Sequence, residues 1–177
     1  MRRFEIVHRI DNPTIVKKPK RSTSASAGYD FLATETVCVP SIWKQIAGLF
    51  IGGLLVANTD TKIKPTLIKT GIKACFEKDE VLKLYNRSSN PIKRGLILAN
   101  GVGVVDSDYY NNPDNDGEIM FAFYNLFPFD ITIEKGEKIG QGVFEKFLIT
   151  DDDEANGERS GGFGSTGVWN YGKMWCR

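Results

Sequence analysis

The chain has 177 residues, of which 41% are hydrophobic and 25% are charged, and its formal net charge is +1. This length and composition predict a soluble globular protein with one main domain and room for a hydrophobic core. Because the net charge is close to zero, no overall field draws the chain to nucleic acid or to a membrane surface, and we expect direct binding to neither.

Up to residue 150 the chain is dominated by short apolar and β-branched segments between turns. The predicted strands are residues 4–10, 36–39, 66–76, 81–85, 95–98, 117–124, 129–133 and 138–149. The basic residues within 17–21, interrupted by Pro19, are interpreted as a solvated loop, and residues 112–117 and 134–137 suit tight turns. Many short strands with almost no helix predict an all-β fold, a jelly-roll-like β-sandwich.

One segment departs from the strand pattern and predicts an inserted short helix at residues 41–57. Ser41 is placed as its N-cap and Asn58 as an end signal. It is shorter than the roughly 20 residues that cross a bilayer, so we interpret it as an amphipathic or buried helix. Its apolar residues recur on one helical face at Ile42, Ile46, Phe50 and Leu54.

The composition changes after Thr150 to an acidic run followed by several glycines. Such a polar segment buries too little apolar surface to order itself alone. We therefore divide the chain into a β domain at residues 1–150, with the helical insertion at 41–57, and a flexible glycine-rich arm and tail at residues 151–177.

The cysteines Cys38, Cys75 and Cys176 are odd in number and lack metal-finger spacing, which suits unpaired thiols in a reducing compartment. The first residues contain an acid and no apolar core of a secretory signal, so a cytoplasmic location is expected.

Several common chemistries are excluded by the motifs. The single histidine, His8, is assigned a structural role in the first strand, and no HExxH, paired-cysteine or P-loop pattern is present. Residues 162–167 fit G-x-G-x-x-G literally, but only a short tail follows them, so a dinucleotide-binding fold is not indicated.

Three clusters can bind a nucleotide. Glycines around Phe163 in the tail allow a backbone nest for an anion, and Arg159 adds a guanidinium; a flexible linker is the alternative. Arg87 and the two serines after it place a guanidinium and two hydroxyls at a strand end, where they can bind phosphate; an ordinary surface turn is the alternative. The glycine-rich segment 100–109 permits a hairpin around a flat base with Asp106 as general base, the alternative being a polar hairpin end.

Five segments occur in an order that resembles the homotrimeric dUTPase family, of the phage or Gram-positive bacterial type. They are residues 26–30, 87–89, 103–109, 136–141 and 159–167. The resemblance implies a jelly-roll subunit, a homotrimer with shared active sites, and hydrolysis of dUTP to dUMP and pyrophosphate with Mg²⁺. This activity would supply dUMP and limit the incorporation of uracil into DNA.

The resemblance also implies roles for individual residues. Asp106 matches the carboxylate that activates water for attack on the α-phosphate, and Tyr109 matches the ring beneath the deoxyribose that excludes a 2′-hydroxyl. Asp30 matches an acid that supports Mg²⁺ indirectly, through water. The residues implied to bind the substrate are Arg87, Ser88, Ser89, Asn100, Gly103, Val105, Tyr109, Gln141, Arg159, Phe163, Gly164, Ser165 and Thr166.

The chain departs from the usual family pattern at several places. Lys138 and Gly140 stand where arginine and alanine are usual, and the stretches 41–57 and 110–117 are lengthened. A dCTP deaminase shares the Arg-Ser-Ser motif, but its later glutamate is absent from residues 119–124. A repressor partner is expected if the chain is phage-derived, and the insertion is its candidate surface; packing within the trimer is the alternative.

Overall fold

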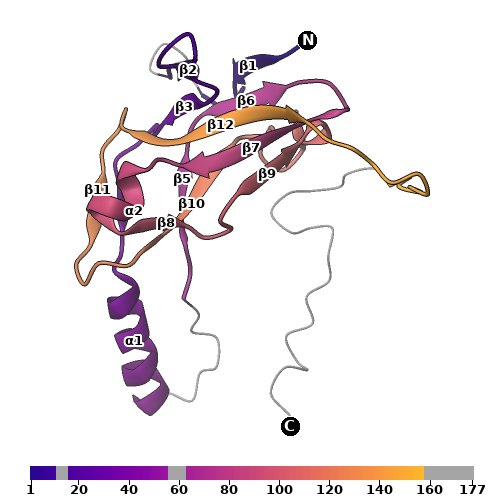
Figure 1. The fold of residues 1–177 in the computed structure, drawn as a ribbon. Helices are drawn as coiled ribbons and strands as arrows, with labels where there is room; N and C mark the ends of the chain where they lie inside the picture. The colour runs from indigo at the N-terminus through magenta and orange to yellow at the C-terminus, as the bar shows by residue number, and fades with distance from the viewer. Residues whose placement is uncertain (11–15, 56–62, 158–177) are drawn as a thin grey trace.

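The computed structural model describes residues 1–10, 16–55 and 63–157. The elements of this part of the chain, drawn in Figure 1, are β1 (Arg3–Ile6), β2 (Lys20–Arg21), β3 (Tyr29–Leu32), β4 (Val37–Val39), α1 (Ile42–Leu55), β5 (Thr66–Lys69), β6 (Ile72–Cys75), β7 (Glu80–Asn86), α2 (Ser89–Arg94), β8 (Leu96–Leu98), β9 (Gly103–Asp106), the 3-10 helix η2 (Ser107–Tyr109), β10 (Met120–Asn125), β11 (Ile131–Ile133) and β12 (Lys138–Lys146).

The strands form antiparallel sheets. The largest has the order β2-β3-β12-β7-β9, and a second has the order β5-β10-β8. Two strand pairs, β1-β6 and β11-β4, complete the β body. The order within the largest sheet matters for function because β7 lies between β12 and β9 and therefore fixes both of them.

The core lies between the two larger sheets. Phe31 of β3 and Leu82 of β7 are fully buried on one side, and Phe121 of β10 and Ile68 of β5 are buried on the other. The rings of Phe31 and Phe121 have their centroids 5.6 Å apart, within the range of favourable aromatic contact. This arrangement confirms the predicted all-β, jelly-roll-like sandwich.

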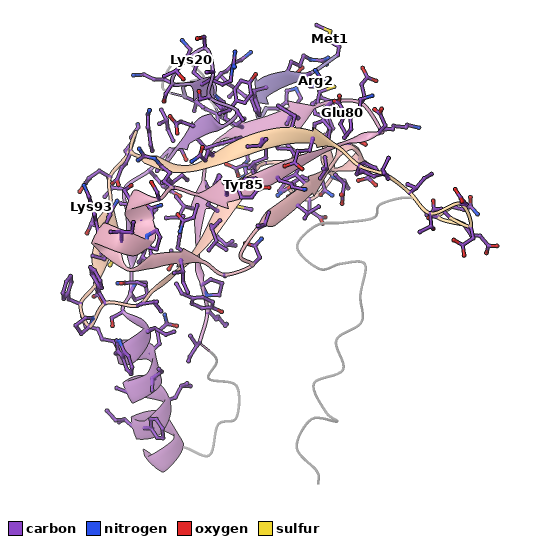
Figure 2. The ribbon with its side chains drawn as sticks, in the orientation of Figure 1. Met1, Arg2, Lys20, Glu80, Tyr85 and Lys93 are labelled. Atoms are coloured by element: carbon purple, nitrogen blue, oxygen red, sulfur yellow. The ribbon has the colours of Figure 1, made fainter. Side chains whose placement is uncertain are left out.

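The first strand is tied to the central strand by a buried carboxylate. Glu80, at the start of β7, is only 2% exposed, and its Oε1 accepts a hydrogen bond of 2.7 Å from Nε of Arg2. Figure 2 shows the two residues side by side at one end of the sheet. A buried carboxylate needs such a partner, so this pair fixes the N-terminal end of β1 over β7.

The inserted helix is confirmed as α1, and so is its predicted N-cap. Ser41 Oγ accepts a hydrogen bond of 3.2 Å from the backbone N–H of Trp43, as an N-cap does. The same hydroxyl donates to the carbonyl of Phe127, which fixes the start of α1 on the loop between β10 and β11. The end signal at Asn58 lies outside the described residues.

The helix projects away from the β body, and its exposed apolar side is the unusual feature (Figure 1). Ile42 and Ile46 are half-buried, but Phe50 is 76% exposed and Ile51 is 61% exposed. In the described part of the chain no helix is long and apolar enough to span a membrane.

Some predicted strand boundaries were wrong, and glycines explain two of them. The segment 66–76 is two strands, β5 and β6, because Gly71 turns the chain with a φ of +66°. The strand expected from residue 117 begins at Met120, since Gly117 has a φ of +73°. The strand expected at 4–10 ends at Ile6, and His8 is in a turn rather than in a strand.

Other elements escaped the sequence reasoning altogether. Within the segment interpreted as a solvated loop, Lys20 and Arg21 form the edge strand β2, which pairs with β3. Neither β3 nor α2 was among the predicted strands and helices, and β9 lies in the segment 100–109, which was interpreted only as a hairpin. The strand expected at 138–149 ends at Lys146, and residues 147–157 are exposed. The domain boundary at residue 150 stays a prediction.

Gly140 explains one departure from the family pattern. An added Cβ would lie 2.0 Å from Cε1 of the buried Phe121, so there is no space for the usual alanine. We expect Gly140→Ala to lower the free energy of unfolding by about 1–3 kcal/mol, the usual cost of overpacking a core. Thermal unfolding measures the change. Gly157→Ala is the matched control, because its Cβ would meet nothing within 4 Å, and equal stability of the two variants would contradict the packing argument.

Candidate active site

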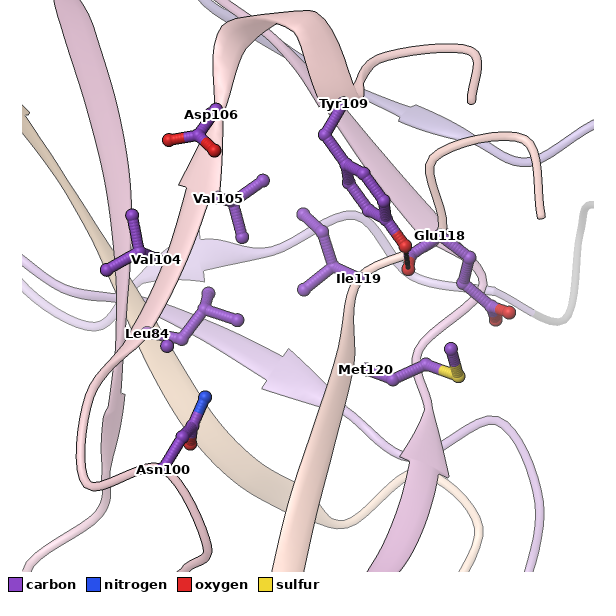
Figure 3. A pocket seen from close by; sticks show the side chains of 10 residues that line it. Leu84, Asn100, Val104, Val105, Asp106, Tyr109, Glu118, Ile119 and Met120 are labelled. Atoms are coloured by element: carbon purple, nitrogen blue, oxygen red, sulfur yellow. Dashed lines mark hydrogen bonds between the residues drawn. The ribbon is translucent and has the colours of Figure 1, made fainter. Parts of the chain in front are cut away.

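A hairpin and its neighbours enclose the first group of predicted site residues. Strand β9 follows a turn after β8 and pairs with β7, with Gly103 opposite Leu84 and Asp106 opposite Val81. The hairpin borders a cavity of about 240 Å³. As Figure 3 shows, the cavity is lined by Leu84, Asn100, Gly103, Val104, Val105, Asp106, Tyr109, Glu118, Ile119 and Met120.

Close packing at Gly103 brings the hairpin against β7. A Cβ added at Gly103 would lie 3.0 Å from Cβ of Leu84, tighter than an ordinary side-chain contact. At the tip of the hairpin, Gly101 adopts a φ of +67° that side chains disfavour. The two glycines therefore allow a narrow hairpin whose backbone can approach a flat ligand closely.

Asp106 stands at the exposed end of β9, where the strand passes into η2. Besides the first cavity, it borders a second, open one of about 690 Å³ together with Ser107, Asp108 and Phe147. Figure 3 shows its carboxylate above Val105 at the strand end. A carboxylate in this position is accessible to water and adjoins the hairpin cavity, as a general base must.

Tyr109 closes the cavity on the side of β10. The residue is 9% exposed, and its hydroxyl donates to the carbonyl of Glu118 over 3.4 Å. The same hydroxyl accepts a hydrogen bond of 2.6 Å from Nδ2 of Asn115. The ring is therefore held at its outer end and lines the cavity (Figure 3).

The second group of predicted residues lies around the antiparallel pair of strands β3 and β12. Gln141 is paired with Asp30 in the register of these strands. Gly28 lies so close that an added Cβ would be 2.2 Å from Oε1 of Gln141, so glycine leaves room for this amide. The first and fourth family segments are thus brought into direct contact.

Asp30 is held as an anion in this group. Its Oδ2 accepts hydrogen bonds from Nζ of Lys138 at 2.6 Å and from Oγ of Ser22 at 2.8 Å. Partial burial raises the pKa of Asp30, but these two hydrogen bonds and the charges of Lys138 and Arg87 lower it further than burial raises it. The contribution of this carboxylate to stability is therefore present above its ordinary pKa of 3.8 and is lost as the pH falls through the lower folded value.

The Arg-Ser-Ser segment begins where β7 ends. Nη1 of Arg87 donates to the carbonyl of Lys138 over 3.2 Å, which directs the guanidinium toward β12 and Asp30. Ser88 is exposed at the N-cap of α2 without a side-chain cap hydrogen bond, and Ser89 follows it half-buried. A guanidinium and adjacent hydroxyls offer donors suited to phosphate oxygens.

A residue that sequence reasoning missed fixes this segment in place. Asn90 is 2% exposed, and its Nδ2 donates to the carbonyl of Ile139 and to Oδ1 of Asn86, both at 2.8 Å. It therefore ties α2 to β12, two residues before Gln141. A buried asparagine between an Arg-Ser-Ser motif and a proline was a possible signal, but its partner on β12 requires the fold.

The two groups do not meet within one chain. Asp106 pairs with Val81 near one end of β7, and Arg87 follows its other end. Six residues at about 3.3 Å each separate these positions by about 20 Å. The structure therefore brings together Asn100, Gly103, Val105, Asp106 and Tyr109, and separately Asp30, Arg87, Ser88, Ser89 and Gln141.

The remaining predicted residues lie outside the described part of the chain. They are Arg159, Phe163, Gly164, Ser165 and Thr166. Conversely, Leu84, Glu118, Ile119 and Met120 line the hairpin cavity without having been predicted. Their sequence carries no motif, because they reach the cavity through strand pairing and through the loop that precedes β10.

Within residues 1–10, 16–55 and 63–157, no cluster of three or more histidine, cysteine, aspartate or glutamate side chains could hold a metal ion. Asp30 lies close enough for the charge of Arg87 to lower its pKa, and its Oδ2 already accepts hydrogen bonds from Lys138 and Ser22. These residues fit a Mg²⁺ ion that keeps several waters and takes its other ligands mainly from phosphates, as Mg²⁺ commonly does.

Comparisons with known proteins agree on one family. Residues 55–167 match the family model described as dUTPase. The chain is 48% identical over 170 residues to the deoxyuridine 5'-triphosphate nucleotidohydrolase of Lactococcus lactis subsp. lactis, covering 95% of this chain and 99% of that protein.

Solved structures show the same fold. The crystal structure of dUTPase from Streptococcus mutans matches with a TM-score of 0.67 at 36% identity, covering 84% of this chain and 98% of that chain. A point-mutant dUTPase of phage phi11 of S. aureus matches with a TM-score of 0.61 at 15% identity, covering 89% of this chain and 97% of that chain, and it coordinates a structural Mg(II) ion.

Proposed function

We propose that a water molecule activated by Asp106 hydrolyses dUTP at the α-phosphate, since this chain belongs to the dUTPase family and is a deoxyuridine triphosphate hydrolase. The products are dUMP and pyrophosphate, and the active sites are shared between the subunits of a homotrimer. The observation that carries the proposal is the hairpin cavity with Asp106 at its edge.

The hairpin supports binding of the base and the sugar. Its backbone between Gly103 and Val105, with the amide of Asn100, lines the cavity and offers donors and acceptors to the edge of uracil. Tyr109 lies across the cavity and would support the deoxyribose with its ring. A 2′-hydroxyl would be crowded against that ring, which gives selectivity for a deoxynucleotide.

The chemical step needs little from the protein besides a base and positioning. Asp106 accepts a proton from a water molecule, whose oxygen forms a bond to the α-phosphorus. The bond from that phosphorus to the bridging oxygen breaks, and this oxygen leaves as part of pyrophosphate. Arg87, Ser88, Ser89 and Gln141 would hold the phosphate oxygens and the developing negative charge.

Mg²⁺ bound to the phosphates would neutralise part of their charge when present. Asp30 is the side chain we assign to its surroundings, acting through water because its carboxylate is already bonded to Lys138 and Ser22. The Mg(II) ion of the phage phi11 dUTPase gives a precedent in a protein of the same fold.

The separation of the two groups along β7 supports shared sites. The backbone of Arg87 lies about 20 Å along β7 from Val81, the partner of Asp106, at about 3.3 Å per strand residue, which is too far for one substrate to bridge the two groups within one chain. A homotrimer solves this if Asp106 of one subunit faces Arg87 of the next. The tail residues Arg159, Phe163, Gly164, Ser165 and Thr166 are proposed to close over the substrate and exclude water.

The deaminase alternative is disfavoured by the strand that would carry its acid. Strand β10 contains no acidic residue between Met120 and Asn125. Glu118, just before it, is committed elsewhere, since its Oε1 accepts the backbone N–H of Gly71 at 2.8 Å and its carboxylate pairs with Arg9.

The general-base role of Asp106 is tested by Asp106→Asn, which keeps the side-chain shape but cannot accept a proton from water. We expect kcat for pyrophosphate release from dUTP to fall by about a hundredfold or more, with dUTP binding retained. The control is Asp130→Asn, which replaces a carboxylate that accepts hydrogen bonds from the backbone N–H of Ser41 and from Nζ of Lys44. Turnover at the parent rate in Asp106→Asn would overturn the assignment.

Shared sites are tested by mixing two inactive variants, Asp106→Asn and Arg87→Ala, after unfolding and refolding them together. Random assembly leaves about a quarter of the sites with both groups intact if each site combines two subunits. Activity should therefore return in the mixture but in neither variant alone. A mixture that stays inactive, while co-refolded wild-type chains recover, would show that each site belongs to one chain.

The exposed side of α1 is assigned to packing within the trimer, with a repressor partner as the alternative. Replacing Phe50 and Ile51 by serine should weaken the trimer in sedimentation experiments, because two largely exposed apolar side chains would lose their partner surface. Leu148→Ser, at a residue that is 97% exposed, is the control. An unchanged trimer would leave this surface for another protein.

A further inference from the structure

We propose that Asn115 and Lys73 are positioning residues for sugar selection: Asn115 holds the hydroxyl of Tyr109, and Lys73 holds the loop that carries Asn115. The inference rests on the proposed function, in which the Tyr109 ring supports the deoxyribose. It concerns the lengthened loop at residues 110–117, which the sequence set apart from the usual family pattern.

Asn115 fixes the outer end of the Tyr109 ring. Its Nδ2 donates to the tyrosine hydroxyl at 2.6 Å, and its Oδ1 accepts the backbone N–H of Gly117 at 3.1 Å. Because both the nitrogen and the oxygen of the Asn115 side-chain amide are hydrogen-bonded, the loop itself fixes the orientation of this amide. The tyrosine hydroxyl then donates onward to the carbonyl of Glu118 (Figure 3).

The same loop also fixes the backbone of Tyr109. The carbonyl of Tyr109 accepts the N–H of Asn112 at 3.2 Å. Gly117, with a φ of +73°, passes so close that an added Cβ would lie 2.4 Å from that carbonyl oxygen. The loop therefore closes on Tyr109 at both its backbone and its hydroxyl, and the ring has little freedom to shift.

Lys73 fixes the loop to the β1-β6 pair. Its side chain is fully buried, and Nζ donates to Oδ1 of Asn111 at 2.5 Å and to Oδ1 of Asp116 at 2.8 Å. The ammonium also lies 5.0 Å from the ring centroid of Tyr110. Because a buried ammonium is costly without partners, releasing the loop would leave this charge uncompensated.

These contacts also hold two left-handed backbone positions. Asn111 and Asp116, the two residues that Lys73 holds, have φ values of +58° and +60°, a region that asparagine and aspartate enter more often than other residues with a side chain. Such conformations persist where the surroundings impose them. Asp116 is held further by the backbone N–H of His8, which donates to its Oδ2 at 2.6 Å.

Sugar selection is the property most sensitive to this arrangement. The ribose and deoxyribose substrates differ by one oxygen atom, so rejection by crowding depends on a displacement of the ring by a fraction of an ångström. A ring with a loosened hydroxyl could move away from the 2′ position. The loss would then appear in the preference for dUTP over UTP rather than in turnover of dUTP.

The experiment compares kcat/KM for dUTP and for UTP in three variants: Asn115→Ala, Tyr109→Phe and the double variant. We expect each single change to lower the dUTP-to-UTP ratio by about fivefold, the size of one hydrogen bond. The double variant should fall no further than Tyr109→Phe alone, because the hydrogen bond between Asn115 and the Tyr109 hydroxyl is already lost in that single variant. A ratio unchanged in Asn115→Ala would overturn the inference.

Lys73→Met should lower the same ratio, and Lys73→Arg should restore part of it, because an arginine keeps the charge beside Asp116. The control is Asn125→Ala. Asn125 is also buried and donates hydrogen bonds of 3.0 and 2.8 Å to the carbonyls of Val39 and Phe129, and it lies at the opposite end of β10 from Met120, which lines the cavity with Tyr109. If Asn125→Ala lowered the dUTP-to-UTP ratio as much as Lys73→Met does, the effect would be one of general destabilisation, and the inference would be contradicted.

Failure of the proposed function gives a different result. A wild-type chain that hydrolyses UTP as well as dUTP would contradict the role of Tyr109 itself. Independently of activity, the flip rate of the Tyr109 ring in ¹³C-tyrosine-labelled protein should rise in Asn115→Ala. An unchanged flip rate would overturn the positioning role whatever the substrate preference.

Discussion

The pairing of β7 with β12 on one side and β9 on the other is the constraint on which the molecule depends. β12 runs along β7 from Gly140 to Lys146, and β9 pairs with its first half. Each neighbour carries site residues, so the register of one strand decides where both groups lie. A slip of one residue would turn every side chain of β9 to the opposite face and remove Val105 from the core.

Much of the fold follows from sequence pattern because burial dictates it. Strand β7 and its partner β12 were predicted as apolar and β-branched segments between turns, and the N-cap of α1 from Ser41. Helix α2 was missed because proline argues against a helix, whereas Pro91 stands in its first turn, where no intrahelical N–H is needed. The division at Gly71 depends on a turn that a run of β-branched residues concealed.

Sequence motifs propose the candidate site as a set of residues but not as a geometry. They point to Asp106 and Arg87, yet only the strand register shows that these two residues occupy opposite ends of β7. Residues such as Asn90 and Asn115 escaped prediction for the same reason. Their chemistry is ordinary in sequence, and their importance comes from partners that the fold brings to them from distant positions.

Division of the site between subunits, as we propose, has a physical consequence for each half. A phosphate group and a base held on different chains cannot adjust to each other through a shared backbone, so each half must be rigid before assembly. The structure meets this requirement with buried polar bridges rather than apolar packing alone. Asn90 ties the phosphate half to β12, and Lys73 ties the sugar half to the β1-β6 pair. Because a buried polar group is costly when unpaired, each bridge makes departure from the bound geometry more unfavourable than loss of an apolar contact would.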